Sequence, residues 1–397
     1  MKRICFIIAL TVSVCLFGQG RQHTTVTANI ADNPSLCLQS CSGPQENAKM
    51  LESALQACGW FRVVPGDKAQ KVSIRVEAIC LPEPGNCRYE ARVTPAGKEP
   101  FTVNANDSDP KAAALKLTDA ILRQLFRIPA ICSRRIAYVA TGRHNLKEIF
   151  TCWLDGSGQQ RLTNNNAIST EPAWGHSGAL VYTLAKHNML SVVLVDTQNN
   201  RQRVVSQGKG LNASAALSAN GQYLALPVSG GHKVDLVVKD LSNGKSRRLT
   251  DDVSVESSPC WSPDGQTLCY VSDKLGRPQL FLVAAGGGPS TRLSLGGNEC
   301  VSPDWSRVSN RLCYCTRSNT GQYVIAVLDM RNPKQPPEIV TGAAGDWEAP
   351  SWAPDGRHLV CTRSTGRSRD LYIVDTWLKS FRPLSQGANL ALPAWQP

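Results

Sequence analysis

The stretch "SPCWSPDGQTLCY", Ser258–Tyr270, contains a Pro-x-Trp strand, a turn and an apolar strand in direct succession. In the turn, Pro263 presets its own φ angle, Asp264 can accept local hydrogen bonds, and Gly265 tolerates a positive φ. This chemistry is typical of a tight connection between two strands. The stretch therefore predicts a β-rich fold, and its recurrence along the chain decides which one.

Related stretches begin at Glu171 ("EPAWGHSGALVY") and Ala349 ("APSWAPDGRHLVC"), and the chain ends on "PAWQP" at Pro393–Pro397. The tryptophans of these stretches, together with Trp305 and Leu217, follow one another at intervals of 43–47 residues. Each unit continues with a third strand such as "YVIAVLD" and a fourth that ends near Leu-Thr or Leu-Ser. Four strands in a unit of this length are typical of β-propeller blades. The pattern predicts an all-β six-bladed propeller over residues 131–397.

The last unit, "PAWQP", has no turn and no apolar partner strand after it. An unused partner stands at the other end of the repeats, in "RRIAYVATG" at Arg134–Gly142, which has no Pro-x-Trp strand before it. We therefore expect the C-terminal strand to become the innermost strand of the first blade. Such pairing closes the ring and leaves no open strand edge, whereas a linear array would expose two.

The residues before the repeats divide into three parts. Residues 1–20 combine a basic start, an apolar run and small residues, which indicates a cleaved export signal that is too short to span a membrane. Residues 21–35 predict a flexible segment. Residues 36–130 predict a small α/β domain with two helices, "QENAKMLESALQACGW" and "DPKAAALKLTDAILRQLF", the second capped by Asp109 and Pro110. No transmembrane segment is expected in the mature protein.

Composition excludes several classes of function. The formal net charge of +12 is spread through the chain and forms no basic helix or finger motif, so nucleic-acid binding is not expected. The six histidines show no metal-ligand spacing, and no Cys-x-x-Cys pair occurs, so neither a metal nor another cofactor is expected. Export favours disulfides, and two pairs flank turns: Cys80–Cys87 and Cys260–Cys269. The alternative is that these are buried thiols that pack as small apolar side chains.

Taken together, the chain resembles the TolB family of periplasmic propeller proteins. The resemblance rests on the helix "ALKLTDAILRQLF", the junction "IPAICSRRIAYVA", the repeat "PCWSPDGQTLCYVSDKLGRPQLFLV" and the ending "PAW" plus two residues. It implies a non-enzymatic periplasmic component of the Tol–Pal system that supports outer-membrane integrity and envelope constriction at cell division. It also implies a Pal-like outer-membrane lipoprotein as the partner, with TolA or other inner-membrane Tol components as further partners.

The resemblance places the Pal site on loops that lead into the innermost strands, at one mouth of the propeller channel. Carried to this sequence, the candidate residues are Ser169, Thr170, Glu171, Asn212, Ser214, Ser257, Ser258, Asn298, Glu299, Trp347 and Glu348. Trp347 stands out, because exposed aromatic side chains often anchor interfaces; the alternative is that it packs against Pro350. Any one of the polar residues is equally interpreted as a solvated loop residue. The remaining repeat tryptophans, Trp174, Trp261, Trp305 and Trp352, are expected in the core between blades.

Two other functions stay open at this point. Related propellers serve as accessories of serine peptidases, but "DGSGQQ" lacks the Gly-x-Ser-x-Gly spacing and no hydrolase-sized region remains outside the repeats. A ligand-binding propeller is the second alternative. The aspartates that close the third strands, Asp196, Asp240, Asp329 and Asp375, are expected to be turn residues, since no calcium-loop pattern surrounds them.

Overall fold

The computed structural model describes residues 33–66, 72–175, 178–199, 201–208, 210–229, 233–293, 299–342, 345–366, 368–385, 387 and 389–397. The predicted signal peptide and residues 21–32 of the predicted flexible segment lie outside the described residues. The last residue of that predicted segment, Ser35, begins the first strand.

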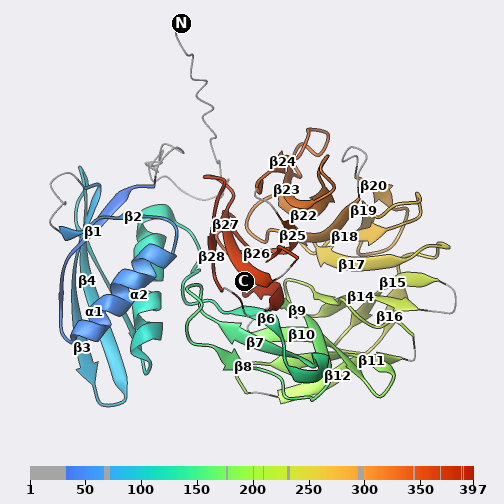
Figure 1. The fold of residues 1–397 in the computed structure, drawn as a ribbon, viewed down its shortest axis with the longest axis horizontal. Helices are drawn as coiled ribbons and strands as arrows, with labels where there is room; N and C mark the ends of the chain where they lie inside the picture. Colours follow the sequence, from blue (N-terminus) through green and yellow to red (C-terminus); the bar gives the residue numbers. More distant parts are fainter. Residues whose placement is uncertain are drawn as a thin grey trace, which may run out of the picture.

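The N-terminal region is a five-stranded sheet with two helices. The strand order is β2-β1-β3-β4-β5, in which β1 pairs in parallel with β2 and β3 and the other pairs are antiparallel. Figure 1 shows α2 between this sheet and the repeat region. The elements are β1 (Ser35–Ser42), α1 (Gln45–Ala57), β2 (Arg62–Val63), β3 (Ile74–Glu83), β4 (Asn86–Pro95), β5 (Phe101–Asp107) and α2 (Pro110–Phe126).

Helix α2 follows the local signals in the sequence. The Asp109 side chain accepts a hydrogen bond from Lys111 N at 3.0 Å, and Pro110 occupies the first turn, where its missing N–H is not needed. The helix ends at Arg127, which adopts a left-handed conformation with φ 60°. Its buried face includes Leu115, Leu117 and Ile121, which belong to the core of the N-terminal region. The predicted cap is therefore confirmed.

In the described part of the chain, the repeats form one eight-stranded sheet and four four-stranded sheets. The eight-stranded sheet consists of two four-stranded antiparallel meanders that meet at a single parallel pair, Lys147 with Ile168, so six meanders follow one another along the repeats. The first is β29-β6-β7-β8, with β6 (Ile136–Thr141), β7 (Lys147–Cys152), β8 (Gln160–Arg161) and β29 (Leu390–Trp395). A short 3-10 turn, η2 (Arg143–Asn145), joins β6 to β7. The second and third are β9 (Ile168–Trp174), β10 (Ala179–Lys186), β11 (Met189–Asp196), β12 (Arg201–Gly208), and β13 (Ala216–Leu217), β14 (Tyr223–Ser229), β15 (Val234–Asp240), β16 (Ser246–Arg248).

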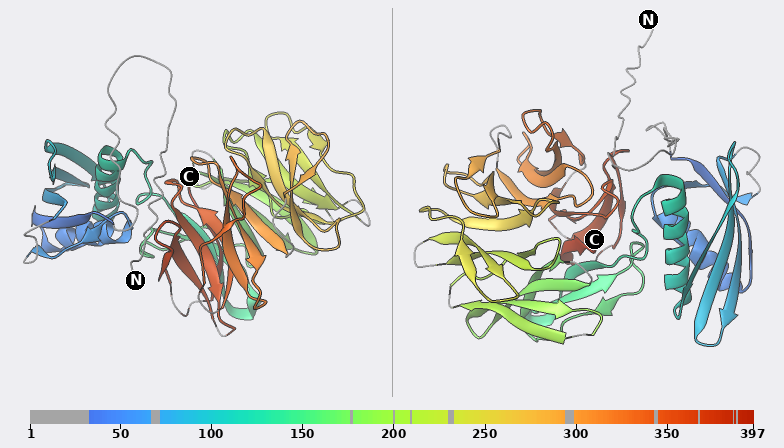
Figure 2. Two further views of the ribbon diagram at one scale, coloured as in Figure 1. Left: turned by 90° about the horizontal axis from the view of Figure 1, so that it is seen from above. Right: turned by 180° about the vertical axis from the view of Figure 1, so that it is seen from behind.

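The remaining three meanders continue in the same order, and Figure 2 shows all of them arranged side by side beside the α/β region. Their strands are β17 (Glu256–Trp261), β18 (Thr267–Ser272), β19 (Gln279–Ala284), β20 (Thr291–Arg292); β21 (Cys300–Trp305), β22 (Arg311–Arg317), β23 (Tyr323–Asp329), β24 (Glu338–Ile339); and β25 (Asp346–Trp352), β26 (His358–Ser364), β27 (Arg369–Asp375), β28 (Ser380–Pro383). We call β29, β9, β13, β17, β21 and β25 the inner strands, because residues of all six line one central cavity.

The C-terminal strand pairs with the first strand of the repeats, as the sequence predicts. β29 runs antiparallel to β6, with Trp395 opposite Ile136 and Leu390 opposite Ala140. Beyond the strand, Gln396 N donates to Arg135 O at 2.8 Å, and Arg135 N donates to the Gln396 side chain at 3.0 Å. The two ends of the repeat region are therefore joined through backbone hydrogen bonds.

The repeat tryptophans lie between neighbouring meanders, which confirms the expectation from the sequence. Trp174, Trp261, Trp305, Trp352 and Trp395 are all buried. Three indole N–H groups donate to a backbone carbonyl of the adjacent inner strand: Trp174 to Ala394 at 3.0 Å, Trp261 to Ala216 at 3.0 Å, and Trp352 to Asp304 at 3.1 Å. Each of these tryptophans thus contributes both apolar burial and an inter-meander hydrogen bond.

The Leu-Thr and Leu-Ser endings of the repeats have a structural role that the sequence analysis did not assign. In four of the meanders, the hydroxyl oxygen of the Thr or Ser at this position accepts a hydrogen bond from a backbone N–H near the start of the third strand. The pairs are Ile149–Thr163, Leu236–Thr250, Ile325–Thr341 and Leu371–Ser385, at 2.8–3.1 Å. The hydroxyl ties the outermost strand back to its neighbour after regular pairing has ended.

The α/β region packs against the first and last meanders through an apolar and ionic interface. Trp60 and Phe61 share a core cluster with Ala353 and Leu371. The Trp60 indole N–H donates to Asp355 at 2.9 Å. Arg357 donates to Asn33 at 2.7 Å and makes a buried ion pair with Asp375 at 2.5 Å. Gly59 allows this close approach, because a Cβ there would lie 2.6 Å from His358 Nε2.

Candidate partner-binding site

The predicted site residues gather at one end of the repeat region, where the inner strands begin. We call this end the entry mouth, and the opposite end, where the inner strands finish at their tryptophans, the tryptophan end. Ser169, Thr170 and Glu171 lie in β9, Ser257 and Ser258 in β17, and Trp347 and Glu348 in β25; Asn212, Ser214 and Glu299 precede inner strands, and Asn298 lies outside the described residues. Most of these residues are therefore in strands, which corrects the expectation that they lie in loops.

A left-handed residue lies within five of the inner strands, and shortly before the sixth, β13, just below the entry mouth. These residues are Glu171, Ser214, Ser258, Ser302, Ala349 and Leu392, with φ between 47° and 53°. Five of the six precede a proline. Left-handed backbone costs a non-glycine residue about 1–2 kcal/mol, and the pairing register shifts at this point in five of the inner strands. The bulge turns each strand into the central cavity, which these residues line.

Glu171 joins two inner strands instead of facing solvent freely. Its carboxylate accepts hydrogen bonds from Ser214 N at 2.8 Å, from Ser214 Oγ at 2.5 Å and from Thr183 Oγ1 at 2.9 Å. Ser214 belongs to the next meander, so this network crosses between the two. Three donors largely satisfy a carboxylate, and the Glu171 and Ser214 side chains are therefore engaged within the chain.

The expectation that Trp347 is an exposed anchor is wrong. Its side chain is 0% exposed and packs edge-to-face on Tyr372 and Phe381, with ring centroids 5.4 Å and 5.0 Å apart. The guanidinium of Arg363 lies over the same ring at 5.4 Å. Because side chains alternate along a strand, Trp347 in β25 faces the core between two meanders while its neighbour Glu348 faces the other way.

Two further predicted residues are buried, and others remain accessible. Ser169 is fully buried and its hydroxyl accepts a hydrogen bond from Asn165 at 2.9 Å, while Asn212 accepts one from Ser206 at 2.7 Å. The half-buried residues are Thr170, Glu171, Ser214, Ser257, Ser258, Glu299 and Glu348. The accessible polar surface at the entry mouth is thus smaller than the predicted set.

Glu299 is held in an ionic cluster on the rim of the entry mouth. Arg317 Nε donates to its carboxylate at 2.6 Å and the Tyr323 hydroxyl donates at 2.9 Å. These two hydrogen bonds, first that from Arg317, hold the pKa of Glu299 below its usual value. Glu299 is therefore ionised and its orientation is fixed by neighbours from the same meander.

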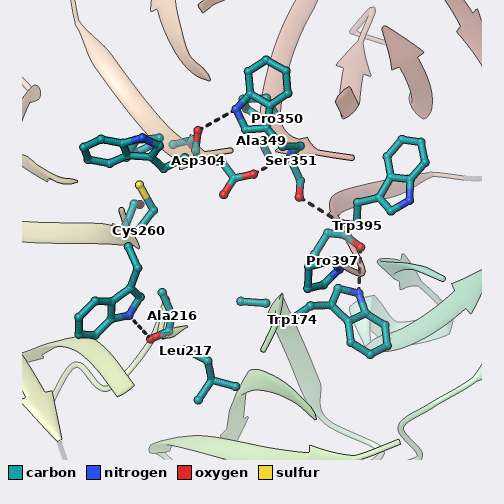
Figure 3. A pocket seen from close by; sticks show the side chains of 18 of the residues that line it. Trp174, Ala216, Leu217, Cys260, Asp304, Ala349, Pro350, Ser351, Trp395 and Pro397 are labelled. Carbon is teal, nitrogen blue, oxygen red and sulfur yellow. Dashed lines mark hydrogen bonds between the residues drawn. The ribbon is translucent and has the colours of Figure 1, made fainter. Parts of the chain in front are cut away.

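The central cavity, of about 280 Å³, contains a carboxylate that the sequence analysis missed. Asp304 occupies the middle position of a Pro-x-Trp stretch, where the other repeats have Ala, Cys or Ser. Figure 3 shows its side chain directed toward the middle of the cavity. Burial raises the pKa of Asp304 to about 6, although Trp352 N donates to it at 2.7 Å. The signal was present in "SPDWS", as an acidic residue where small ones recur.

Arg307 reaches across the cavity at the tryptophan end. It belongs to the turn "SRVSN", which has neither Pro nor Gly. The turn keeps its closing bond, from Ser306 N to Arg311 O at 2.9 Å. Arg307 Nη2 donates to Trp174 O at 2.7 Å, on a meander three positions away. The guanidinium therefore partly covers this end of the cavity.

The predicted disulfides are absent, because the structure has all thirteen described cysteines as free thiols. The sulfur atoms of Cys80 and Cys87 lie 3.3 Å apart, in contact but not bonded. Cys260 and Cys269 stand directly opposite each other in the β17–β18 pair. Burial, followed by the contact with Cys80, raises the pKa of Cys87 to about 12, so its thiol stays protonated. These cysteines act as small buried side chains.

The described residues show no metal centre and no membrane span. No three His, Cys, Asp or Glu side chains in the part of the chain that the structure covers are grouped so as to hold a metal ion. Within the same residues, no helix is both long enough and apolar enough to cross a membrane.

An N-terminal α/β region followed by antiparallel meanders around a central cavity defines a propeller-type repeat protein. Residues 122–397 match the family described as "TolB beta propeller domain". Because that match covers more than half of its length, the chain belongs to this family. A solved structure, TolB from Acinetobacter baumannii, shares the fold with a TM-score of 0.81 over 92% of this chain and 97% of that chain, at 21% identity.

Two curated relatives are Tol–Pal system proteins. One, TolB from Desulfosudis oleivorans, is 36% identical over 93 residues, which are 23% of this chain and 21% of the relative. TolB from Anaeromyxobacter sp. strain K is 34% identical over 92 residues, or 23% of this chain and 20% of the relative. The matched segment thus spans about a fifth of the length of each curated relative.

Proposed function

We propose that this chain is a periplasmic, non-enzymatic component of a Tol–Pal system that binds a Pal-like outer-membrane lipoprotein. The observation that carries the proposal is the family match over residues 122–397 together with a TolB-like fold over 92% of the chain. The curated relatives are Tol–Pal proteins by name. The proposed role is support of outer-membrane integrity and envelope constriction at division, with TolA or other inner-membrane Tol components as further partners.

We further propose a two-domain arrangement, with residues 36–130 as the α/β domain and residues 131–397 as a closed six-bladed propeller. Contacts between successive inner strands support the closure: β29 contacts β9, and the contacts continue through β13, β17, β21 and β25 back to β29. Each of the six meanders would then be one blade, and β29 would be the innermost strand of the first. A closed ring leaves no edge strand open to aggregation.

The proposed Pal site is the entry mouth. It is a rigid platform, because the inner strands that begin there are tied to one another by side-chain hydrogen bonds such as those of Glu171. Its accessible polar residues include Thr170, Ser257, Ser258 and Glu348. Binding residues are commonly presented at such positions by a stable scaffold.

Binding of the mature protein to the soluble domain of the cognate Pal-like lipoprotein, measured by calorimetry, tests this function. We expect a one-to-one complex that is lost in Ser258→Arg, which places a long charged side chain at the entry mouth. A matched control is Ser242→Arg, an exposed serine in the turn after β15 at the tryptophan end. Absence of binding by the unmodified protein contradicts the proposal, and peptidase activity toward unfolded substrates would support the accessory-peptidase alternative.

A further inference from the structure

The entry mouth has a hollow on one side, between the last meander and the first two. Its volume is about 490 Å³. It is formed where β7 and β9 meet, next to the start of β29 and the edge of β25. The lining combines two cations, one carboxylate, amides, a hydroxyl pair and an apolar floor. These residues come from positions between 139 and 392, so only the folded chain brings them together.

Neither of the two cations in the hollow forms an ion pair with an acid of the described part of the chain. Lys147 begins β7 and Arg369 begins β27. Among the described residues, neither side chain lies within ion-pair distance of an acid, whereas other basic residues at the same mouth are paired: Lys233 with Asp251, Lys274 with Asp252 and Arg317 with Glu299. Glu348 also lines the hollow, which leaves it with one excess positive charge.

The floor of the hollow is apolar and held in place. Val139 and Ala391 are register partners in the β29–β6 pair, and Leu392 N donates to Thr362 Oγ1 at 3.1 Å. Ile168, on the rim, leaves 40% of its surface exposed. A rigid floor lowers the entropy that a ligand must lose on binding, and its apolar atoms suit the methylene groups of an inserted side chain.

We propose that this hollow receives a glutamate or aspartate side chain from the Pal-like partner, with Lys147 and Arg369 as the residues that select the acidic group. The inference rests on the proposed function, because the partner is the protein bound at the entry mouth. Two separated cations above an apolar floor match a carboxylate on a short methylene stem. A guanidinium can pair with a carboxylate through two parallel hydrogen bonds, which adds directional selectivity.

Neutral and reversed variants test the two cations separately. Close charge pairs at protein interfaces often couple by more than 1.4 kcal/mol, which is tenfold in affinity. We expect Lys147→Met and Arg369→Met each to raise the Kd for the soluble Pal-like domain by about tenfold, and the double Lys147→Glu/Arg369→Glu variant to raise it by about a hundredfold or more. The matched control is Lys245→Glu, an exposed lysine at the tryptophan end, which should bind like the unmodified protein.

The partner side supplies a second readout that loss of folding cannot imitate. The partner's surface acids are replaced by lysine one at a time. One replacement should weaken binding to the unmodified protein but restore binding to the Lys147→Glu/Arg369→Glu variant. Thermal unfolding of each variant is measured alongside. If the double variant binds with unchanged affinity while Ser258→Arg abolishes binding, the proposal that the hollow receives an acidic side chain is contradicted. The proposed function is not affected by that result. Failure of the unmodified protein to bind the partner overturns both.

Discussion

Deletion of residues 393–397 should destabilise the whole repeat region. The deletion removes Trp395, which is 3% exposed, the pairing of Ala394 and Trp395 with β6, and four further hydrogen bonds between β29 and its neighbours. Those bonds are Trp174 Nε1 to Ala394 O, Trp395 N to Ser351 Oγ, Gln396 N to Arg135 O, and Arg135 N to Gln396 Oε1, at 2.8–3.1 Å. Losing a buried tryptophan costs about 3–5 kcal/mol, and each hydrogen bond about 1 kcal/mol.

The total, about 7–9 kcal/mol, approaches the whole stability of a typical domain, about 5–15 kcal/mol. The assay is equilibrium unfolding in urea, followed by tryptophan fluorescence and far-UV circular dichroism. A shorter deletion of residues 396–397 is the control, because it keeps Trp395 and loses only the two bonds to Arg135, worth about 2 kcal/mol. If the chain without residues 393–397 unfolded at the same urea concentration as the intact chain, the claim that pairing of β29 with β6 stabilises the repeat region would be refuted.

Three further predictions concern the stability of variants at His358, Gly59 and Trp347. Burial by itself lowers the pKa of His358, but the neighbouring acids Asp355 and Asp375 outweigh it and raise the pKa to about 9 against its usual 6.5. The contribution of the histidine to stability, roughly 3 kcal/mol, is therefore complete below pH 6.5 and is lost as the pH rises through 9. Urea unfolding of His358→Ala should differ from that of the intact chain at pH 6 and much less at pH 10. Gly59→Ala should destabilise the chain by well over 1 kcal/mol in thermal unfolding, since φ there is +74° and the new Cβ meets His358, whereas Gly221→Ala, with φ +72° and open space, should cost only about 1 kcal/mol. Trp347→Ala should cost about 3–5 kcal/mol of stability through lost packing.

Each of these three predictions has a result that would contradict it. A constant difference between His358→Ala and the intact chain from pH 6 to pH 10 would contradict the ionic role of the histidine. Equal melting temperatures for the two glycine variants would mean that the α/β region does not pack closely against His358. If Trp347→Ala lost partner binding without losing stability, Trp347 would be an interface residue, as the sequence predicted.

The repeat architecture was accessible from the sequence because its signals are local and recur. A Pro-x-Trp stretch followed by residues that favour a tight turn, as in Ser258–Tyr270, predicts two strands joined by that turn. No information from distant residues is needed. The partner of the last strand was also predictable, since only "RRIAYVATG" lacked a Pro-x-Trp strand of its own. The cap of α2 at Asp109 was equally local.

The candidate site was only partly predictable, because its details depend on strand register. A shift of one residue turns a side chain from one face of a strand to the other. Trp347 was expected to be exposed in a loop that leads into an inner strand, whereas β25 already begins at Asp346 and the alternation of its side chains turns Trp347 toward the core. The internal bonds of Glu171 depend on Ser214 in the next meander, which no pattern within one repeat reveals.

The amino-acid sequence alone was sufficient for the repeat pattern and the α/β region before it, since each depends on spacing and on residue types in short segments. It was also sufficient for the pairing of β29 with β6, because each of these two strands lacks a partner within its own repeat unit. Contacts between segments far apart in the chain depended on the folded protein. Arg307 crosses to Trp174, and the hollow gathers Lys147, Arg369 and the β29 floor, through side-chain directions set by twist, bulges and register. Twist, bulges and register are fixed only when strands pack together. The order of residues along the chain therefore does not show which distant side chains will meet.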